Sequence, residues 1–284
     1  MNFSDFRLPD LRFTLPIAEI QAALNNPKIV FVLVSALVLC LVLFVAWYTH
    51  KPASFEAAVK SGSPVRIRAY LKSTGLTPND KNTDGMSFLF RAIQNRASVG
   101  ILNYLVKKGG DLHDRNNQGE SAFAVAIINK NTPDVLRWLK HKGLDVNERD
   151  NNGITPLMLA IQENTSVKIV EALLELGARV SDRAEFGITP LMLAAGRNLN
   201  PYVTLTLLKH GAKLNDRSAE GATPLMLAAG WNPNACEIID VLLDCDADAT
   251  AKDKEGRMAV DYAKNNPALA DTETFWRLNN LSYD

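Results

Sequence analysis

Short apolar blocks recur along most of the chain, separated by polar turns. The clearest block is TPLMLA at residues 155–160, two residues after Gly153. Nearly the same letters follow Gly187 and Gly221, so the spacing between successive glycines is 34 residues. Self-similarity at a fixed period of this size predicts a solenoid of stacked repeats.

The same register extends the pattern in both directions. Related blocks follow Gly85, Gly119 and Gly256, and SFEAAV at residues 54–59 matches the start of a repeat without its glycine. The terminal repeats of a solenoid are atypical because one side faces water. We therefore expect seven repeats, the first and the last acting as caps.

The sequence pattern of each repeat predicts a tight turn followed by two helices. Asn or Asp before the glycine favours the turn, and Thr or Ser then caps a short apolar helix that has Pro at its first position in the best-formed repeats. A second helix, such as 167–176, has its apolar residues on one face. Glycines typical of left-handed helix ends follow, namely Gly75, Gly109, Gly143, Gly177 and Gly211. Asp246 replaces this glycine in the sixth repeat, where we expect a less well-formed helix end.

An uncharged apolar run covers residues 29–49, ahead of the repeats. Its length, at about 1.5 Å per residue, matches the roughly 30 Å of a bilayer core. A cleaved signal peptide has a shorter apolar region close to the start, and a buried helix is rarely apolar on every face. We expect a single transmembrane helix here, after an N-terminal tail of residues 1–28. Residues 16–24 of this tail read either as a short amphipathic helix on the membrane surface or as a frayed turn.

The numbers of basic residues before and after this run are nearly equal, so they give only a slight preference for one side of the membrane. Three basic residues precede the run and four follow it closely, which leans slightly toward a cytoplasmic repeat domain. Three cysteines are too few for a disulfide framework and lean the same way. An extracytoplasmic (periplasmic) position is the close alternative.

Composition and motifs argue against several functions. Lys plus Arg equals Asp plus Glu at 31 each, so no net positive field attracts nucleic acid. The four histidines are scattered, no His/Cys pattern of a metal site appears, and the glycines end helices rather than forming a phosphate loop. We expect no catalytic residues, no metal, no cofactor and no small-molecule substrate, and therefore not an enzyme.

The repeated sequence motif resembles that of a known family. The motif G-x-T-P-L-x-L-A-A, with L-L-x-x-G-A-x-(V/L)-N downstream as at residues 207–215, resembles the ankyrin repeat over about residues 52–282. The resemblance implies an all-α solenoid of helix–turn–helix repeats with β-hairpin tips, here preceded by the single transmembrane helix. Met158, Met192 and Met226 stand where the family usually has histidine, and the period is 34 instead of 33. We expect neither departure to threaten the fold.

The resemblance also implies where a partner protein binds, because the family uses its hairpin tips and the exposed face of the first helix. By position, the candidate partner-binding residues are Asn151, Asn152, Glu185, Phe186 and Glu220 at the tips and Glu163, Arg197 and Trp231 at the helix ends. Phe186 and Trp231 stand out because large exposed aromatics are enriched in binding hot spots. Alternatively, each packs locally, for example Trp231 against Pro233 or Tyr202.

A cation stands four residues before each marker glycine, at Lys81, Arg115, Arg149, Arg183, Arg217 and, at the last repeat, Lys252. The row could form an anion-binding edge. An acidic residue directly precedes five of the six, so a solvated hairpin surface is the better interpretation. The short polar residues one position earlier suit local backbone hydrogen bonds.

Together these features predict a single-pass membrane protein whose repeat domain binds another protein. Two functions remain open: an adaptor or scaffold at the membrane, and an inhibitor or protective module that masks one enzyme or toxin there.

Overall fold

The computed structural model describes residues 54–163 and 165–283. The predicted tail 1–28 and the predicted transmembrane helix 29–49 lie outside these residues. Among the helices that the structure describes, none combines the length and the apolar character needed to cross a bilayer. The chain divides between Thr77 and Pro78 into two compact units.

In the first compact unit the structure describes residues 54–77, which form two helices, α3 (Phe55–Lys60) and α4 (Pro64–Thr74). The hydroxyl of Ser54 accepts the amide of Ala57 and so caps α3. The ring of Phe55 is fully buried, and its centroid lies 5.9 Å from that of Tyr70. The helix α4 ends at Gly75, which adopts the predicted left-handed conformation with φ 72°.

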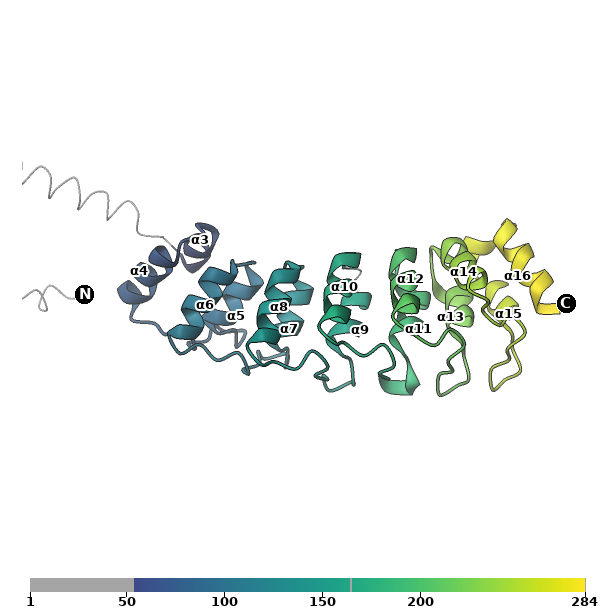
Figure 1. The fold of residues 1–284 in the computed structure, drawn as a ribbon, viewed down its shortest axis with the longest axis horizontal. Helices are drawn as coiled ribbons and strands as arrows, with labels where there is room; N and C mark the ends of the chain where they lie inside the picture. Colours follow the sequence, from purple (N-terminus) through teal and green to yellow (C-terminus); the bar gives the residue numbers. More distant parts are fainter. Residues whose placement is uncertain (1–53, 164, 284) are drawn as a thin grey trace, which may run out of the picture. The chain divides into compact units, whose positions relative to one another are not determined.

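The second compact unit is a row of helix pairs (Figure 1). The pairs are α5 (Phe88–Gln94) with α6 (Val99–Lys107), α7 (Ala122–Ile128) with α8 (Pro133–His141), α9 (Pro156–Gln162) with α10 (Val167–Glu175), α11 (Pro190–Arg197) with α12 (Pro201–Lys209), α13 (Pro224–Trp231) with α14 (Ala235–Asp244), and α15 (Ala259–Ala263) with α16 (Glu273–Tyr283). Short 3-10 helices are η2 (Glu185–Gly187) and η3 (Pro267–Leu269).

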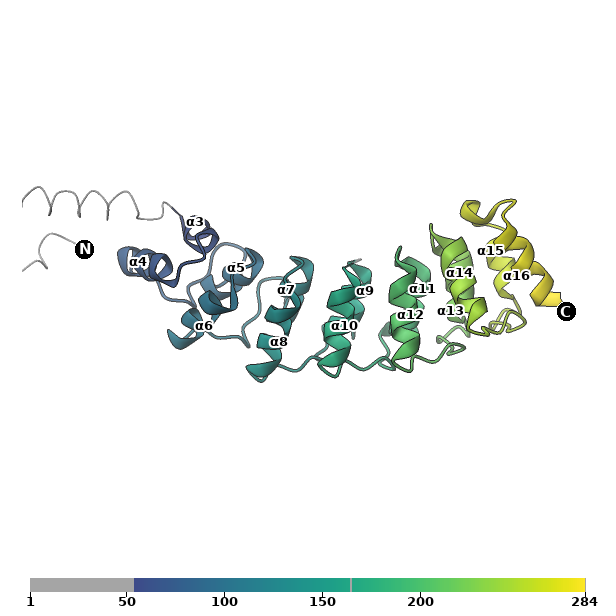
Figure 2. The same ribbon diagram turned by 45° about the horizontal axis from the view of Figure 1, so that its top comes forward.

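Within this row the helices form two layers. The first helix of each repeat contacts the first helix of the next, as α9 contacts α11 and α11 contacts α13. The second helices also stack on one another, as α10 on α12 and α12 on α14 (Figure 2). The described residues of the second unit thus form an all-helical solenoid without strands.

The sequence-predicted caps begin the first helices. In α9, α11 and α13 the hydroxyls of Thr155, Thr189 and Thr223 accept the amide three residues on, and Pro occupies the first helical position. Ser87 and Ser121 do the same for α5 and α7. In α15 the N-cap position is occupied by Met258, which has no hydroxyl. The carboxylate of Asp261 instead accepts a hydrogen bond from the Met258 amide at 2.9 Å.

The second helices end as predicted at left-handed glycines, with one correction. Asp246 takes the same left-handed conformation with φ 65°. Its amide donates to the Leu243 carbonyl at 3.0 Å, just as the Gly211 amide donates to Leu208 at 3.0 Å. The expectation of a less well-formed end at Asp246 is therefore wrong, because a short polar side chain tolerates this conformation.

The hairpin tips are tight turns closed by backbone hydrogen bonds. The amide of Asp150 donates to the Ile154 carbonyl at 3.1 Å, and the amide of Ser218 donates to Ala222 at 3.0 Å. Only glycine suits the position after such a tip. At Gly221, φ is 81° and a Cβ would lie 3.1 Å from the Lys254 amide nitrogen of the next hairpin.

Leucine and methionine of the repeated block fill the core between the layers. Leu157, Leu191 and Leu225 are at most 1% exposed, and so are the methionines that follow them. The amide of Thr223 lies 3.4 Å from the Met226 sulfur. Methionine therefore packs into the core at the position where the resembled family usually has histidine.

Candidate functional site

The cations beside the hairpin tips connect neighbouring repeats. The guanidinium of Arg183 donates to the carbonyls of Gly187 at 2.8 Å and Arg217 at 2.9 Å. It also pairs with Asp216 of the next repeat at 2.5 Å. The corresponding pairs are Lys81–Asp114 at 2.7 Å, Arg115–Glu148 at 3.5 Å and Arg149–Asp182 at 2.9 Å.

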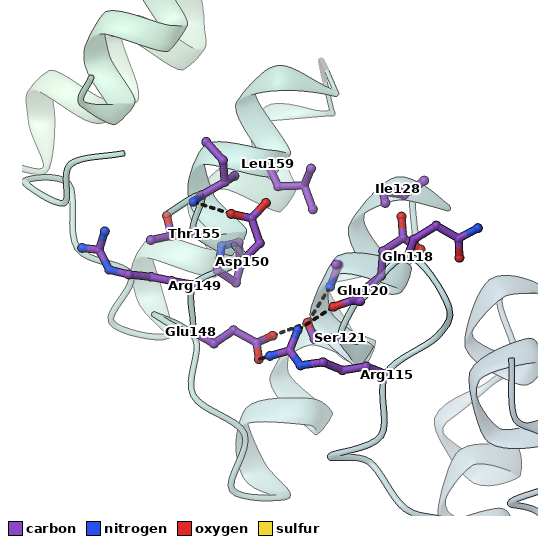
Figure 3. A pocket seen from close by; sticks show the side chains of 14 residues that line it. Arg115, Gln118, Glu120, Ser121, Ile128, Glu148, Arg149, Asp150, Thr155 and Leu159 are labelled. Carbon is purple, nitrogen blue, oxygen red and sulfur yellow. Dashed lines mark hydrogen bonds and ion pairs between the residues drawn. The ribbon is translucent and has the colours of Figure 1, made fainter. Parts of the chain in front are cut away.

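Figure 3 shows one of these connections at close range, where the carboxylate of Glu148 meets both Arg115 and the hydroxyl of Ser121. In the sequence, each acid directly precedes the cation of its own repeat. In the structure the acid pairs with the cation of the preceding repeat, so the row braces the stack and its arginines are not available as an anion-binding edge.

A second connection was missed entirely by the sequence analysis. The side-chain amide of Asn232, which is fully buried, donates to the carbonyls of Ala195 at 2.7 Å and Asn198 at 3.0 Å in the preceding repeat. The same side-chain bond to the preceding repeat recurs at Asn131, Asn198 and Asn266. The signal was present in the sequence as an Asn after most first helices.

The residues predicted to bind a partner gather at one groove across the middle repeats. Five of the eight line it, namely Asn152, Glu185, Phe186, Arg197 and Trp231. Its floor is apolar and comprises Ile154, Leu159, Ile188, Leu193 and Leu227. We call this surface the Phe186–Trp231 groove, and its volume is about 830 Å³. Asn151, Glu163 and Glu220 are exposed but do not line it.

Phe186 occupies an unusual place at the hairpin-tip edge of the groove. Its backbone is left-handed, with φ 55° and ψ 19°, and its side chain leaves the residue 72% exposed. The carbonyl of Phe186 accepts the Ala219 amide at 2.7 Å, which holds this backbone in place. A bulky residue in this conformation carries strain of order 1–3 kcal/mol, a feature found at ligand-binding sites.

Trp231 ends α13 at the helix-end edge of the groove and is 64% exposed. It also contacts an aromatic residue that the sequence did not suggest. Its ring lies edge-on against Tyr262 of the following repeat, with centroids 6.0 Å apart. Trp231 is therefore supported on one side and open on the other.

A polar network holds Tyr262 behind Trp231. The Tyr262 hydroxyl donates to the Asp253 carboxylate at 2.6 Å, and the Arg257 guanidinium lies 4.8 Å from the ring centroid. Arg257 also donates to Asp253 at 2.9 Å. Burial alone would raise the pKa of Asp253, but the hydrogen bonds from Tyr262 and Arg257 outweigh it and lower that pKa to about 2. Burial and the bond to Asp253 raise the pKa of Tyr262 to about 12.

The groove is mainly apolar, with charged side chains at its edges. Apolar side chains, two exposed aromatics and single charges at its edges offer contact area and charge pairing. Within residues 54–163 and 165–283 there is no group of three His, Cys, Asp or Glu side chains that could hold a metal ion.

Comparison with known proteins identifies the repeats. A family model described as ankyrin repeats in three copies matches residues 54–150, 89–184 and 157–253. No curated protein matches the chain. Ankyrin repeats are in general protein-interaction modules, and the matched family is not a catalytic one. The matched segments together span residues 54–253, well over half of the sequence, and the chain belongs to the ankyrin-repeat family.

Proposed function

We propose that this chain is a membrane-tethered adaptor or scaffold that binds another protein through the Phe186–Trp231 groove. The observation that carries the proposal is the pair of exposed aromatics, Phe186 and Trp231, at two edges of one apolar surface. Burial of exposed aromatic surface is a main source of binding energy in protein interfaces.

The tether in this proposal is the uncharged run 29–49, which joins a short tail to a repeat domain of residues 52–282. Confinement to a membrane raises the effective concentration of the groove toward partners at the same membrane. We place the repeat domain on the cytoplasmic side, following the slight excess of basic residues after the run.

The native thiol of Cys245 tests this placement, because the residue is exposed in the structure. A membrane-impermeant thiol reagent should fail to label it in intact cells and label it after lysis, with Cys245→Ser as the blank. Labelling of intact cells would put the repeats outside the cytoplasm, and recovery of the chain in the soluble fraction would remove the tether.

Photocrosslinking tests the groove itself. A benzoylphenylalanine placed at residue 186 or 231 of the full chain in cells should crosslink to the same discrete protein. The same probe at residue 202 is the control, because Tyr202 is 67% exposed and does not line the groove. Identical products from all three positions, or none from 186 and 231, would contradict the proposal. Loss of activity of the crosslinked partner on titration with the chain would favour the inhibitor alternative.

A further inference from the structure

The Phe186–Trp231 groove carries opposite charges at opposite edges. Glu185 lies on the hairpin before α11, and Arg197 is the last residue of that helix. An eight-residue helix rises about 12 Å, so the two charges are separated by a distance on the order of 10 Å. Between them lies the apolar floor.

These two charges differ from the other charged groups of the hairpins. The side chains of Arg149 and Arg183 are held by carbonyls and by a carboxylate of the next repeat. Asp150 also lines the groove, but its carboxylate accepts the amides of Asn152 at 2.9 Å and Ile154 at 2.7 Å within its own turn. In the part of the chain that the structure describes, the side chains of Glu185 and Arg197 have neither a hydrogen bond nor an ion pair, and both are exposed.

The floor is also kept open beside Arg197. Gly196 lines the groove in α11 at the position where α9 has Gln162. Glycine inside a helix costs roughly 0.5–1 kcal/mol relative to alanine, so it is not favoured by the helix itself. Its missing side chain leaves room beside Leu227, whose Cβ would lie 3.4 Å from a Cβ at Gly196.

From this arrangement we infer that the groove binds a partner segment of mixed charge, with a carboxylate at Arg197, an apolar side chain over the floor between Phe186 and Trp231, and a basic side chain at Glu185. The inference rests on the proposed function and adds the chemistry of the partner and its orientation. A purely basic segment would meet Arg197, and a purely acidic one would meet Glu185 and Asp150. Each of these mismatches places like charges together.

Synthetic peptides test the inference directly. The probes are labelled peptides of about twelve residues with a Leu-Phe core, flanked by Asp on one side and Lys on the other in either order, by Asp on both sides, or by Lys on both sides. Binding is measured by fluorescence anisotropy to the full chain in phosphatidylcholine nanodiscs, with empty discs as the blank. A mixed-charge peptide should bind about three- to tenfold tighter than both single-sign peptides, the range that two partly exposed ion pairs supply.

Two charge reversals provide the decisive controls. Arg197→Glu should transfer the preference to the Lys-flanked peptide, and Glu185→Arg should transfer it to the Asp-flanked peptide. Both residues are exposed, so either reversal should shift the thermal midpoint by no more than a few degrees, and a switch of preference cannot arise from misfolding.

Several results would overturn the inference. These are tightest binding of the Lys-flanked peptide by the unaltered chain, equal binding of all peptides, binding of none, or the absence of either switch. Equal binding that is lost in Trp231→Ala would leave the proposed groove standing while refuting the charge rule. If the chain self-associates, and mixing the Arg197→Glu and Glu185→Arg variants restores an association that each alone has lost, the occupant is a second copy of the chain and not such a partner.

Discussion

Trp231 lies edge-on against Tyr262, with ring centroids 6.0 Å apart and an interplanar angle of 76°, while Trp231 itself stays 64% exposed. Tyr262 is fixed in turn by Asp253 and Arg257. An aromatic side chain that is held before binding loses less conformational entropy when a partner covers it. The contact therefore presents Trp231 to the groove in a preorganised position.

Replacement of Tyr262 separates the ring contact from the polar network. Tyr262→Ala removes the ring that supports Trp231 and should lower the yield of partner crosslinked from residue 186. Tyr262→Phe keeps the ring, loses only the hydroxyl's bonds to Asp253 and from Arg257, and should retain most of that yield. Equal yields from both variants would show that the ring contact does not prepare Trp231 for binding.

The acid limb of the stability curve should report on Asp253. Its pKa is about 2 in the folded chain against 3.8 for the free side chain, so the folded state binds the proton more weakly. The resulting stabilisation is fully present above about pH 4 and is lost as the pH falls toward 2, and for this mostly buried carboxylate it amounts to about 1–2 kcal/mol. Asp253→Asn should therefore lower the free energy of unfolding at pH 6, measured with denaturant, and the difference should shrink toward pH 2. A difference that is independent of pH would mean that the charge of Asp253 contributes nothing.

The core of the repeats should be sensitive to truncation. Leu191 is 1% exposed, so Leu191→Ala should destabilise by about 2–5 kcal/mol in denaturant unfolding, through lost contacts and the cavity left behind. Leu281→Ala is the matched control, because Leu281 is 43% exposed and should cost less than about 1 kcal/mol. Similar losses at both positions would contradict the assigned core.

The buried asparagines should matter as connections between repeats. Asn232→Ala removes the donor that the carbonyls of Ala195 and Asn198 share, at a cost of about 1–3 kcal/mol for buried groups left unpaired. Because the bond joins two repeats, hydrogen exchange of α11 and α13 should accelerate together. Asn280→Ala, on the exposed side of α16, serves as the control. Faster exchange in α13 alone would argue that Asn232 acts only within its own repeat.

The periodicity of the sequence was enough to predict the solenoid, because one residue type at each place does one local task. Thr189 caps, Pro190 starts the helix and Leu191 enters the core, and all three act within a few residues of themselves. The tip and helix-end positions of Phe186, Arg197 and Trp231 could also be predicted, because they follow from the same register.

Contacts between repeats could not be predicted from the sequence in the same way. The partner of Arg183 is Asp216, and the support of Trp231 is Tyr262, each about one repeat further along the chain. Such pairs depend on how closely the repeats stack and which way each side chain turns. The adjacent acid at Asp182 was the simpler reading for Arg183, yet Asp182 pairs with Arg149.

Trp231→Ala combined with a crosslinker at residue 186 tests most directly whether the groove binds the partner. Because the side chain is mostly exposed and loses only its contact with Tyr262, the thermal midpoint should stay within about 4 °C of that of the unaltered chain, while the yield of crosslinked partner should fall at least tenfold. A large drop in the midpoint with an unchanged yield would contradict this account, since Trp231 would then stabilise the repeats and would not bind the partner.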